Sequence, residues 1–132
     1  MKSEKGQSLV EFALVLPLII VLLFAIVDFG RAFHVYLTLD HTGREVARLI
    51  SVGGKEADIV NVITSTKTSI DTDESQLTVT YPKTKLSSGS EAKVTLTYPF
   101  KFITPLAGIV DAFFHTKISE PLITDTTVMR VE

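Results

Sequence analysis

The chain has 132 residues, a net charge of -2 and no cysteine. This length suits one small domain with a targeting or membrane segment, and the balanced charge offers no electrostatic argument for binding nucleic acid. Without cysteine, disulfides, thiolate metal ligands and cysteine nucleophiles are excluded. A small domain without disulfides relies on its core or on neighbouring proteins, which favours a subunit of a larger assembly.

An apolar run, LVEFALVLPLIIVLLFAIV, occupies positions 9–27. At about 1.5 Å per residue it nearly crosses a hydrocarbon core of about 30 Å. A cleaved secretory signal peptide has a shorter apolar region and a small-x-small cleavage site, whereas this run ends in DFGR. We therefore predict a retained transmembrane helix over 7–30, with a tolerated kink at Pro17. Lys2 and Lys5 precede the run, so the positive-inside rule places the N-terminus in the cytoplasm.

The helical pattern continues beyond the membrane, over 31–52. Its apolar stripe consists of Phe29, Phe33, Tyr36, Gly43, Ala47 and Ile50, with Leu39 and Val46 beside it. The polar face carries Arg31, Asp40, Arg44, Glu45 and Arg48. This spacing is typical of an amphipathic helix, and the pair Gly53-Gly54 is expected to end it. One long helix is predicted, with its outer stripe packed on the chain's own domain.

The remaining chain, 53–132, reads as a small α+β domain. A short second helix is predicted over 55–70, and 71–75 is a turn or loop. Alternation with period two then predicts a strand near 77–81 and a longer one from Glu91, with a short helix at 107–114 and a closing strand within 123–132. The predicted fold is therefore a long N-terminal helix, transmembrane in one half and amphipathic in the other. It packs on an antiparallel sheet of about three strands, with a second short helix.

Residues with metal-binding or catalytic chemistry are scattered in this sequence. His34 and His41 are seven apart, too far for one zinc ion on a helix without other ligands, and His115 lies far along the chain. The acidic stretch 71–75 lacks the glycine and distal glutamate of a calcium loop. No phosphate-binding loop, nucleophile elbow or carboxylate pair appears. We expect neither a metal nor a cofactor, and no enzymatic activity.

Glu11 is the unusual residue of the apolar run. A carboxylate in mid-bilayer costs about 2.5–3.5 kcal/mol, and less near the interface. Because Glu11 lies only two residues past Leu9, snorkelling and the positive end of the helix ease its burial. Burial cost alone therefore does not separate an interfacial acid from a functional one. What favours function is the short charged leader and Gly6 five residues earlier.

The stretch KGQSLVEFALVLP, followed by DFGR, resembles the N-terminus of the TadE-like family. These proteins are pseudopilins, or minor pilins, of the tight-adherence (Tad/Flp) branch of type IV pili. The resemblance is strongest over 5–31, and it continues more loosely through HTGREVARL and the terminal VMRVE. Two departures from the major Flp pilins, Phe12 in place of a tyrosine and a larger C-terminal domain, favour a minor component.

The resemblance implies a processing step and an assembly role. A membrane-embedded prepilin peptidase would remove the leader, residues 1–6, by cleavage between Gly6 and Gln7. The new α-amino group of Gln7 would then be available to pair with Glu11 of a neighbouring subunit, since paired charges in lipid cost less than separated ones. Expected partners are other pilin or pseudopilin subunits, the peptidase, the assembly platform in the membrane and the lipid bilayer.

Three interpretations remain at this stage. The first is a pilin-like subunit in the cytoplasmic (inner) membrane, single-pass, with the 53–132 domain outside or in the pilus at the cell surface. The second is an unprocessed single-pass protein whose outer domain binds a ligand or partner. The third, an extracytoplasmic enzyme, has no supporting constellation of residues.

Overall fold

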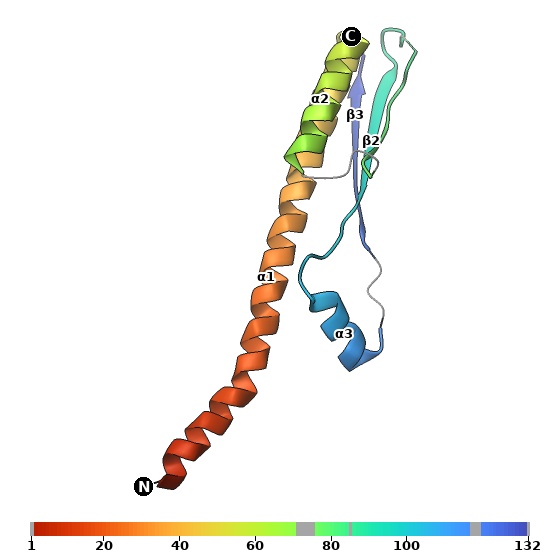
Figure 1. Ribbon diagram of the computed structural model, residues 1–132. Helices are drawn as coiled ribbons and strands as arrows, with labels where there is room; N and C mark the ends of the chain where they lie inside the picture. Colours follow the sequence, from red (N-terminus) through yellow and green to blue (C-terminus); the bar gives the residue numbers. More distant parts are fainter. Residues whose placement is uncertain (1, 71–75, 85, 117–119, 132) are drawn as a thin grey trace. The chain divides into compact units, whose positions relative to one another are not determined.

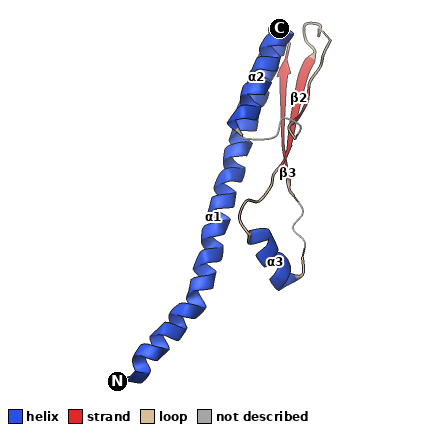
Figure 2. Cartoon of the chain, in the orientation of Figure 1, coloured by secondary structure: helices blue, strands red, loops and turns tan. Residues whose placement is uncertain are grey.

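The computed structural model describes residues 2–70, 76–84, 86–116 and 120–131. Among these residues, three helices and three strands follow one another. Figures 1 and 2 show the course of the chain. In chain order these elements are α1 (Lys2–Ser51), α2 (Glu56–Ser69), β1 (Thr78–Thr80), β2 (Glu91–Pro99), α3 (Leu106–Phe114) and β3 (Leu122–Arg130). The predicted α+β class, the long first helix, the second helix and the three-stranded antiparallel sheet are confirmed.

The long helix α1 ends where the glycine pair allows the chain to turn. Gly53 takes a left-handed backbone conformation, with φ of 69°, which a glycine adopts without steric cost. Its N–H donates to the Ile50 carbonyl at 3.1 Å, and the Gly54 N–H donates to the Leu49 carbonyl at 2.7 Å. These bonds satisfy carbonyls that the helix end would otherwise leave without a partner.

Contacts divide the chain into two compact units, and α1 contributes to both. The first unit joins Met1–Arg31 with Phe102–Ser119, and the second joins Ala32–Lys101 with Glu120–Glu132. The predicted divisions at 1–6, 7–30, 31–52 and 53–132 rest on the membrane and processing arguments and remain predictions.

The sheet of the second unit has the strand order β1-β2-β3, with both pairs antiparallel. Strand β2 buries Ala92, Val94, Leu96 and Tyr98, while the residues between them are exposed or half-buried. This alternation arises because successive side chains of a strand point to opposite faces. The core of the unit is this face of β2 together with buried aliphatic residues of α1.

Gly43 lies where α1 approaches the sheet most tightly among the glycines of this unit. A Cβ atom at this position would lie 2.7 Å from Asp125 Oδ2, 2.8 Å from Thr127 Oγ1 and 3.2 Å from Leu96 Cδ1. The first two distances are shorter than real Cβ contacts. The helix and sheet therefore pack this closely because position 43 carries no side chain.

The predicted apolar stripe of α1 is correct in its C-terminal part and wrong in its N-terminal part. Phe29, Phe33 and Tyr36 are exposed by 79%, 59% and 46%, whereas Val35 and Leu39 are buried. Ala47 follows Phe29 by 18 residues, about five full helical turns, so the buried Ala47 and the exposed Phe29 lie on the same side of the helix. The exposure of the aromatic residues therefore depends on their place along the helix, which a count of apolar residues at three- and four-residue spacing does not predict.

A buried hydroxyl pair joins α1 to α2. Thr42 Oγ1 and Thr66 Oγ1 lie 2.7 Å apart, and both residues are buried. Because each hydroxyl has one proton, one of the two donates to the other, and the hydroxyl that accepts donates to the carbonyl four residues earlier in its own helix, at Thr38 or Val62. Thr66 thus serves the packing of α2, together with buried Ile59.

Candidate functional site

The residues predicted to form the processing and pairing site lie together near the start of α1. Gly6, Gln7 and Glu11 are all exposed, and Pro17 lies within the same continuous helix. The Gln7 side chain donates from Nε2 to Glu11 Oε1 at 3.2 Å, across one helical turn. The Glu11 carboxylate is therefore at the helix surface, beside the residue whose α-amino group cleavage after Gly6 would create.

Gly6 has no packing role among the described residues. A Cβ atom built on it would meet no described atom within 4 Å, and the same is true of Gly30 on the same helix. Glycine also lowers the stability of a helix interior, by roughly 0.5–1 kcal/mol relative to alanine. The fold by itself thus gives no reason for a glycine at position 6.

The apolar half of α1 presents its large side chains outward. Among those exposed by more than half are Leu9, Val10, Phe12, Leu14, Leu18, Leu22, Leu23 and Ile26. In water this surface would be costly, at about 25 cal/mol per Å². Of the helices in the described part of the chain, this one is long and apolar enough to cross a membrane. It is a candidate membrane span.

Asp28 is a buried carboxylate at the end of the apolar run, and sequence reasoning did not single it out. Only 2% of its surface is exposed. Its Oδ1 accepts a hydrogen bond from the Ile103 N–H at 3.3 Å, and its Oδ2 accepts one from the Thr104 hydroxyl. The Arg31 guanidinium lies 3.9 Å from Oδ1. The carboxylate thereby ties the segment that leads into α3 to the end of the candidate span.

The one available sequence signal for Asp28 was its place directly after Val27, in the motif DFGR. An acid at that position is also what an ordinary membrane boundary carries. Its bonding partners are 75 and 76 positions away in the chain, so no local pattern points to them.

The outer half of α1 carries ion pairs on its solvent side. Arg44 Nε lies 3.1 Å from Asp40 Oδ1, and an Arg48 guanidinium nitrogen lies 2.6 Å from Glu45 Oε1. The hydrogen bond from Arg48 holds the pKa of Glu45 below its ordinary value. Such exposed pairs contribute little to stability. The polar face of α1 is therefore a solvated helix surface.

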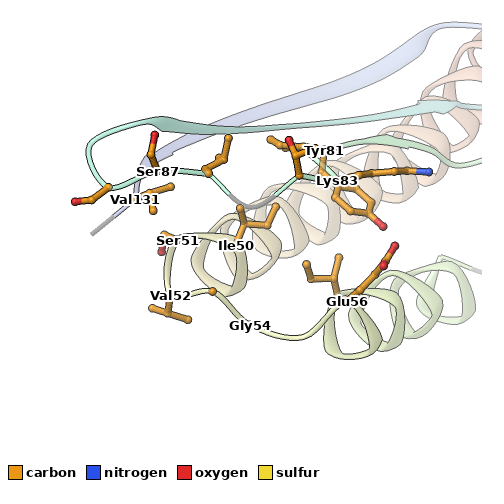
Figure 3. A pocket seen from close by; sticks show the side chains of 15 residues that line it. Ile50, Ser51, Val52, Gly54, Glu56, Tyr81, Lys83, Ser87 and Val131 are labelled. Atoms are coloured by element: carbon orange, nitrogen blue, oxygen red, sulfur yellow. The ribbon is translucent and has the colours of Figure 1, made fainter.

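A hollow at the C-terminal end of α1 is lined by both helices and by residues 81–84 and 86–88 (Figure 3). Its charged lining residues among those described are Glu56 and Lys83, accompanied by aliphatic side chains, Tyr81 and serines. Among the described lining residues, Glu56 is the one carboxylate. We assign it no ligand.

The histidines occupy places that do not form a metal site within the described residues. His34 and His41 both line a shallow groove between α1 and α2. His115 caps α3 in a left-handed conformation, where its N–H donates to the Asp111 carbonyl at 2.9 Å. Among the residues that the structure describes, no group of three or more His, Asp or Glu side chains is placed to hold an ion.

The fold and the candidate span define a class: an α+β protein whose first helix has the length and exposed apolar surface of a membrane anchor. Within this class, the family model described as TadE-like protein matches residues 6–48. The resemblance to the TadE-like family expected from the sequence is confirmed over this segment. Together, the match and the apolar helix suggest a membrane-anchored protein associated with Tad pili. No curated protein and no solved structure matches the chain.

Proposed function

We propose that this chain is a minor pilin or pseudopilin of a Tad (Flp, type IV-like) pilus assembly or secretion system, with no enzymatic activity of its own. It is inserted in the cytoplasmic membrane with its N-terminus inside, and a prepilin peptidase cleaves it after Gly6. The supporting observation is the TadE-like match over residues 6–48, which begins at this glycine. That match includes Glu11 and the whole exposed apolar run.

Three features of the N-terminal helix support this function. Gly6 is unexplained by packing, as expected for a residue that a peptidase recognises. Glu11 is exposed at the surface of an apolar helix, where a neighbouring subunit can reach it. The apolar side chains beyond it first hold the subunit in the bilayer and then pack against other subunits of the assembly.

The role of Glu11 depends on the processing step. Cleavage converts the Gln7 backbone nitrogen into a charged α-amino group, which is absent from the precursor. In lipid, this cation and the Glu11 carboxylate of a neighbour are far less costly together than apart. The pair therefore selects both the partner and the register of assembly.

The test is the N-terminus of the mature protein. Chain extracted from membranes of cells that contain the peptidase should begin at Gln7 by mass spectrometry or N-terminal sequencing. Gly6→Val should keep residues 1–6 attached, because a branched side chain replaces the glycine at the cleavage site. Gly30→Val is the matched control, since it adds the same side chain at an equally open position of the same helix.

An intact Met1 or Lys2 terminus in such cells would overturn the proposal. It would favour the other candidate, an unprocessed single-pass protein whose outer domain binds a ligand or partner. Cleavage of the Gly6→Val variant at the same bond would show that the peptidase does not depend on this glycine. It would then remove the argument drawn from Gly6.

A further inference from the structure

Helix α3 is short and apolar, and the structure leaves its two phenylalanines uncovered. Its sequence, LAGIVDAFF, contains one ionisable residue, Asp111, and none of its residues is buried. Phe113 and Phe114 are exposed by 78% and 74%, and Ile103, just before the helix, is exposed as well. Exposed aromatic residues of this size, adjacent in the chain, indicate a contact surface rather than scattered surface variation.

The segment that leads into α3 is held at the end of the candidate membrane span. Asp28 directly follows the apolar run and accepts hydrogen bonds from Ile103 and Thr104, two and three residues before α3 begins. Residues Met1–Arg31 and Phe102–Ser119 form one compact unit.

We propose that α3 is a second lipid contact, with the side chains of Ile103, Phe113 and Phe114 entering the leaflet at the Asp28 end of the span. This inference rests on the proposed anchoring of α1 in the membrane. Once residues 9–27 are in the bilayer, the Asp28 bonds bring the beginning of α3 to the membrane surface. The chain then contacts the membrane at two points rather than one.

Lipid is the occupant that the observations favour. Once α1 is anchored, the Asp28 bonds hold the start of α3 at the membrane surface. Helix α3 contains no basic residue that would select an anionic protein or headgroup. Phe113 and Phe114 carry large apolar surfaces, and moving such surface from water into lipid is favourable. Asp111, the one polar side chain of α3, is half-buried by the protein.

The experiment uses the absence of cysteine from the chain. Full-length chain with a single introduced cysteine is labelled with an environment-sensitive fluorophore and placed in phosphatidylcholine bilayers containing a doxyl-labelled lipid quencher. Ala112→Cys reports on α3 while keeping both phenylalanines. Leu18→Cys reports on the span, and Asp58→Cys reports on an exposed site of α2.

The labels at positions 112 and 18 should shift to the blue and lose most of their fluorescence to the quencher. The label at 58 should do neither. The double variant Phe113→Ser/Phe114→Ser should return the label at 112 toward the emission of the label at 58. Its matched control, Val60→Ser/Val128→Ser, removes two exposed apolar side chains elsewhere and should leave the label at 112 unchanged.

Two results would overturn the inference. If the label at 18 is quenched while that at 112 behaves like that at 58, the span is anchored and α3 is not in lipid. If the label at 112 is shielded from both lipid and water, and only at high protein density, a second copy of the chain covers α3. If neither the label at 18 nor the label at 112 is shifted or quenched, the result would instead reject the anchoring on which the proposed function rests.

Discussion

Gly43 is the residue at which the packing of α1 on the sheet depends most directly on a single atom. Asp125 and Thr127 on β3 and Leu96 on β2 occupy the space that a side chain here would need. Protein interiors are close-packed and transmit such an insertion as strain. The requirement is steric, since nothing about the helical backbone itself demands a glycine at this point.

Gly43→Ala is therefore expected to be less stable than Gly30→Ala by about 1–3 kcal/mol, the usual cost of overpacking, since both substitutions gain the same helix propensity. Thermal unfolding followed by circular dichroism, in a mild detergent, measures the effect. Gly30→Ala is the control, because its new methyl group meets open space and gains helix propensity of about 1 kcal/mol. Equal melting temperatures for the two variants would contradict the close approach.

Asp28 shows that the environment of a polar residue can likewise depend on contacts made only in the folded chain. A carboxylate that is nearly fully buried is stabilised by its hydrogen bonds to Ile103 and Thr104 and by nearby Arg31. In the sequence it is an acid after an apolar run. In the structure it joins two segments that the chain order keeps far apart.

At the scale of elements, the second helix is held to the first by polar as well as apolar contacts. The Thr42–Thr66 hydroxyl pair is buried between α1 and α2, so neither hydroxyl can exchange its partner for water. A buried hydrogen bond contributes only about 0.5–1.5 kcal/mol net. Leaving one member without its partner costs more than that in many proteins.

Replacing either threonine alone by valine should destabilise the chain by about 1 kcal/mol or more, and replacing both should cost less than the sum. A double-mutant cycle on Thr42→Val and Thr66→Val, read from thermal unfolding, measures this coupling. Thr64→Val is the control: its hydroxyl bonds the Val60 carbonyl in the same way but is exposed on α2. Strict additivity of the two buried substitutions would remove the pair as an inter-helix contact.

The elements themselves follow from local sequence patterns. Residues Gly53 and Gly54 end α1 as predicted, the alternation in β2 buries the predicted face, and the helix at 106–114 lies one residue from its expected start. These features depend on the spacing of apolar residues and on the conformational freedom of glycine. Both can be recognised from residues that are close together in the sequence. The face of α1 was less predictable, because Phe29 and Phe33 satisfy a helical period as well as Val35 and Leu39 do.

At the scale of the whole molecule, the proposed function uses surfaces that the fold leaves uncovered. The apolar run of α1 and the phenylalanines of α3 are exposed in the isolated chain. We interpret the first as the surface for lipid and for other subunits, and the second as a lipid contact. Glu11 is the one acid of the apolar run, at its N-terminal end.

Glu11→Gln should leave membrane insertion intact and impair pilus assembly, because the amide keeps the size of the side chain but cannot neutralise a neighbour's α-amino group. Glu11→Ala should behave alike. Pilus production and the membrane-bound amount of the chain, measured in the same cells, separate assembly from insertion. Glu56→Gln removes a charge from the exposed start of α2 and is the control. Normal pilus production by both Glu11 variants would reject the inter-subunit pairing.

The part of the candidate site that could be predicted from the sequence consists of residues close together in the chain. Gly6, Gln7 and Glu11 stand within one short stretch, and their spacing alone places them near the start of one helix. The hydrogen bonds of Asp28 could not be predicted from the sequence, because its partners are 75 and 76 residues away. The sequence around a single acidic residue does not indicate from which distant backbone N–H or hydroxyl it will accept a hydrogen bond.

The sequence by itself determined the apolar helix, its glycine end, the strand alternation and the motif shared with the TadE-like family. All of these depend on residue types at short spacing, where the backbone period settles the outcome. Only the tertiary structure decided which side of α1 meets the sheet, why position 43 is a glycine and where residues 103–104 attach. Those outcomes depend on atoms brought together from distant parts of the chain, and their space and hydrogen bonds exist only after folding.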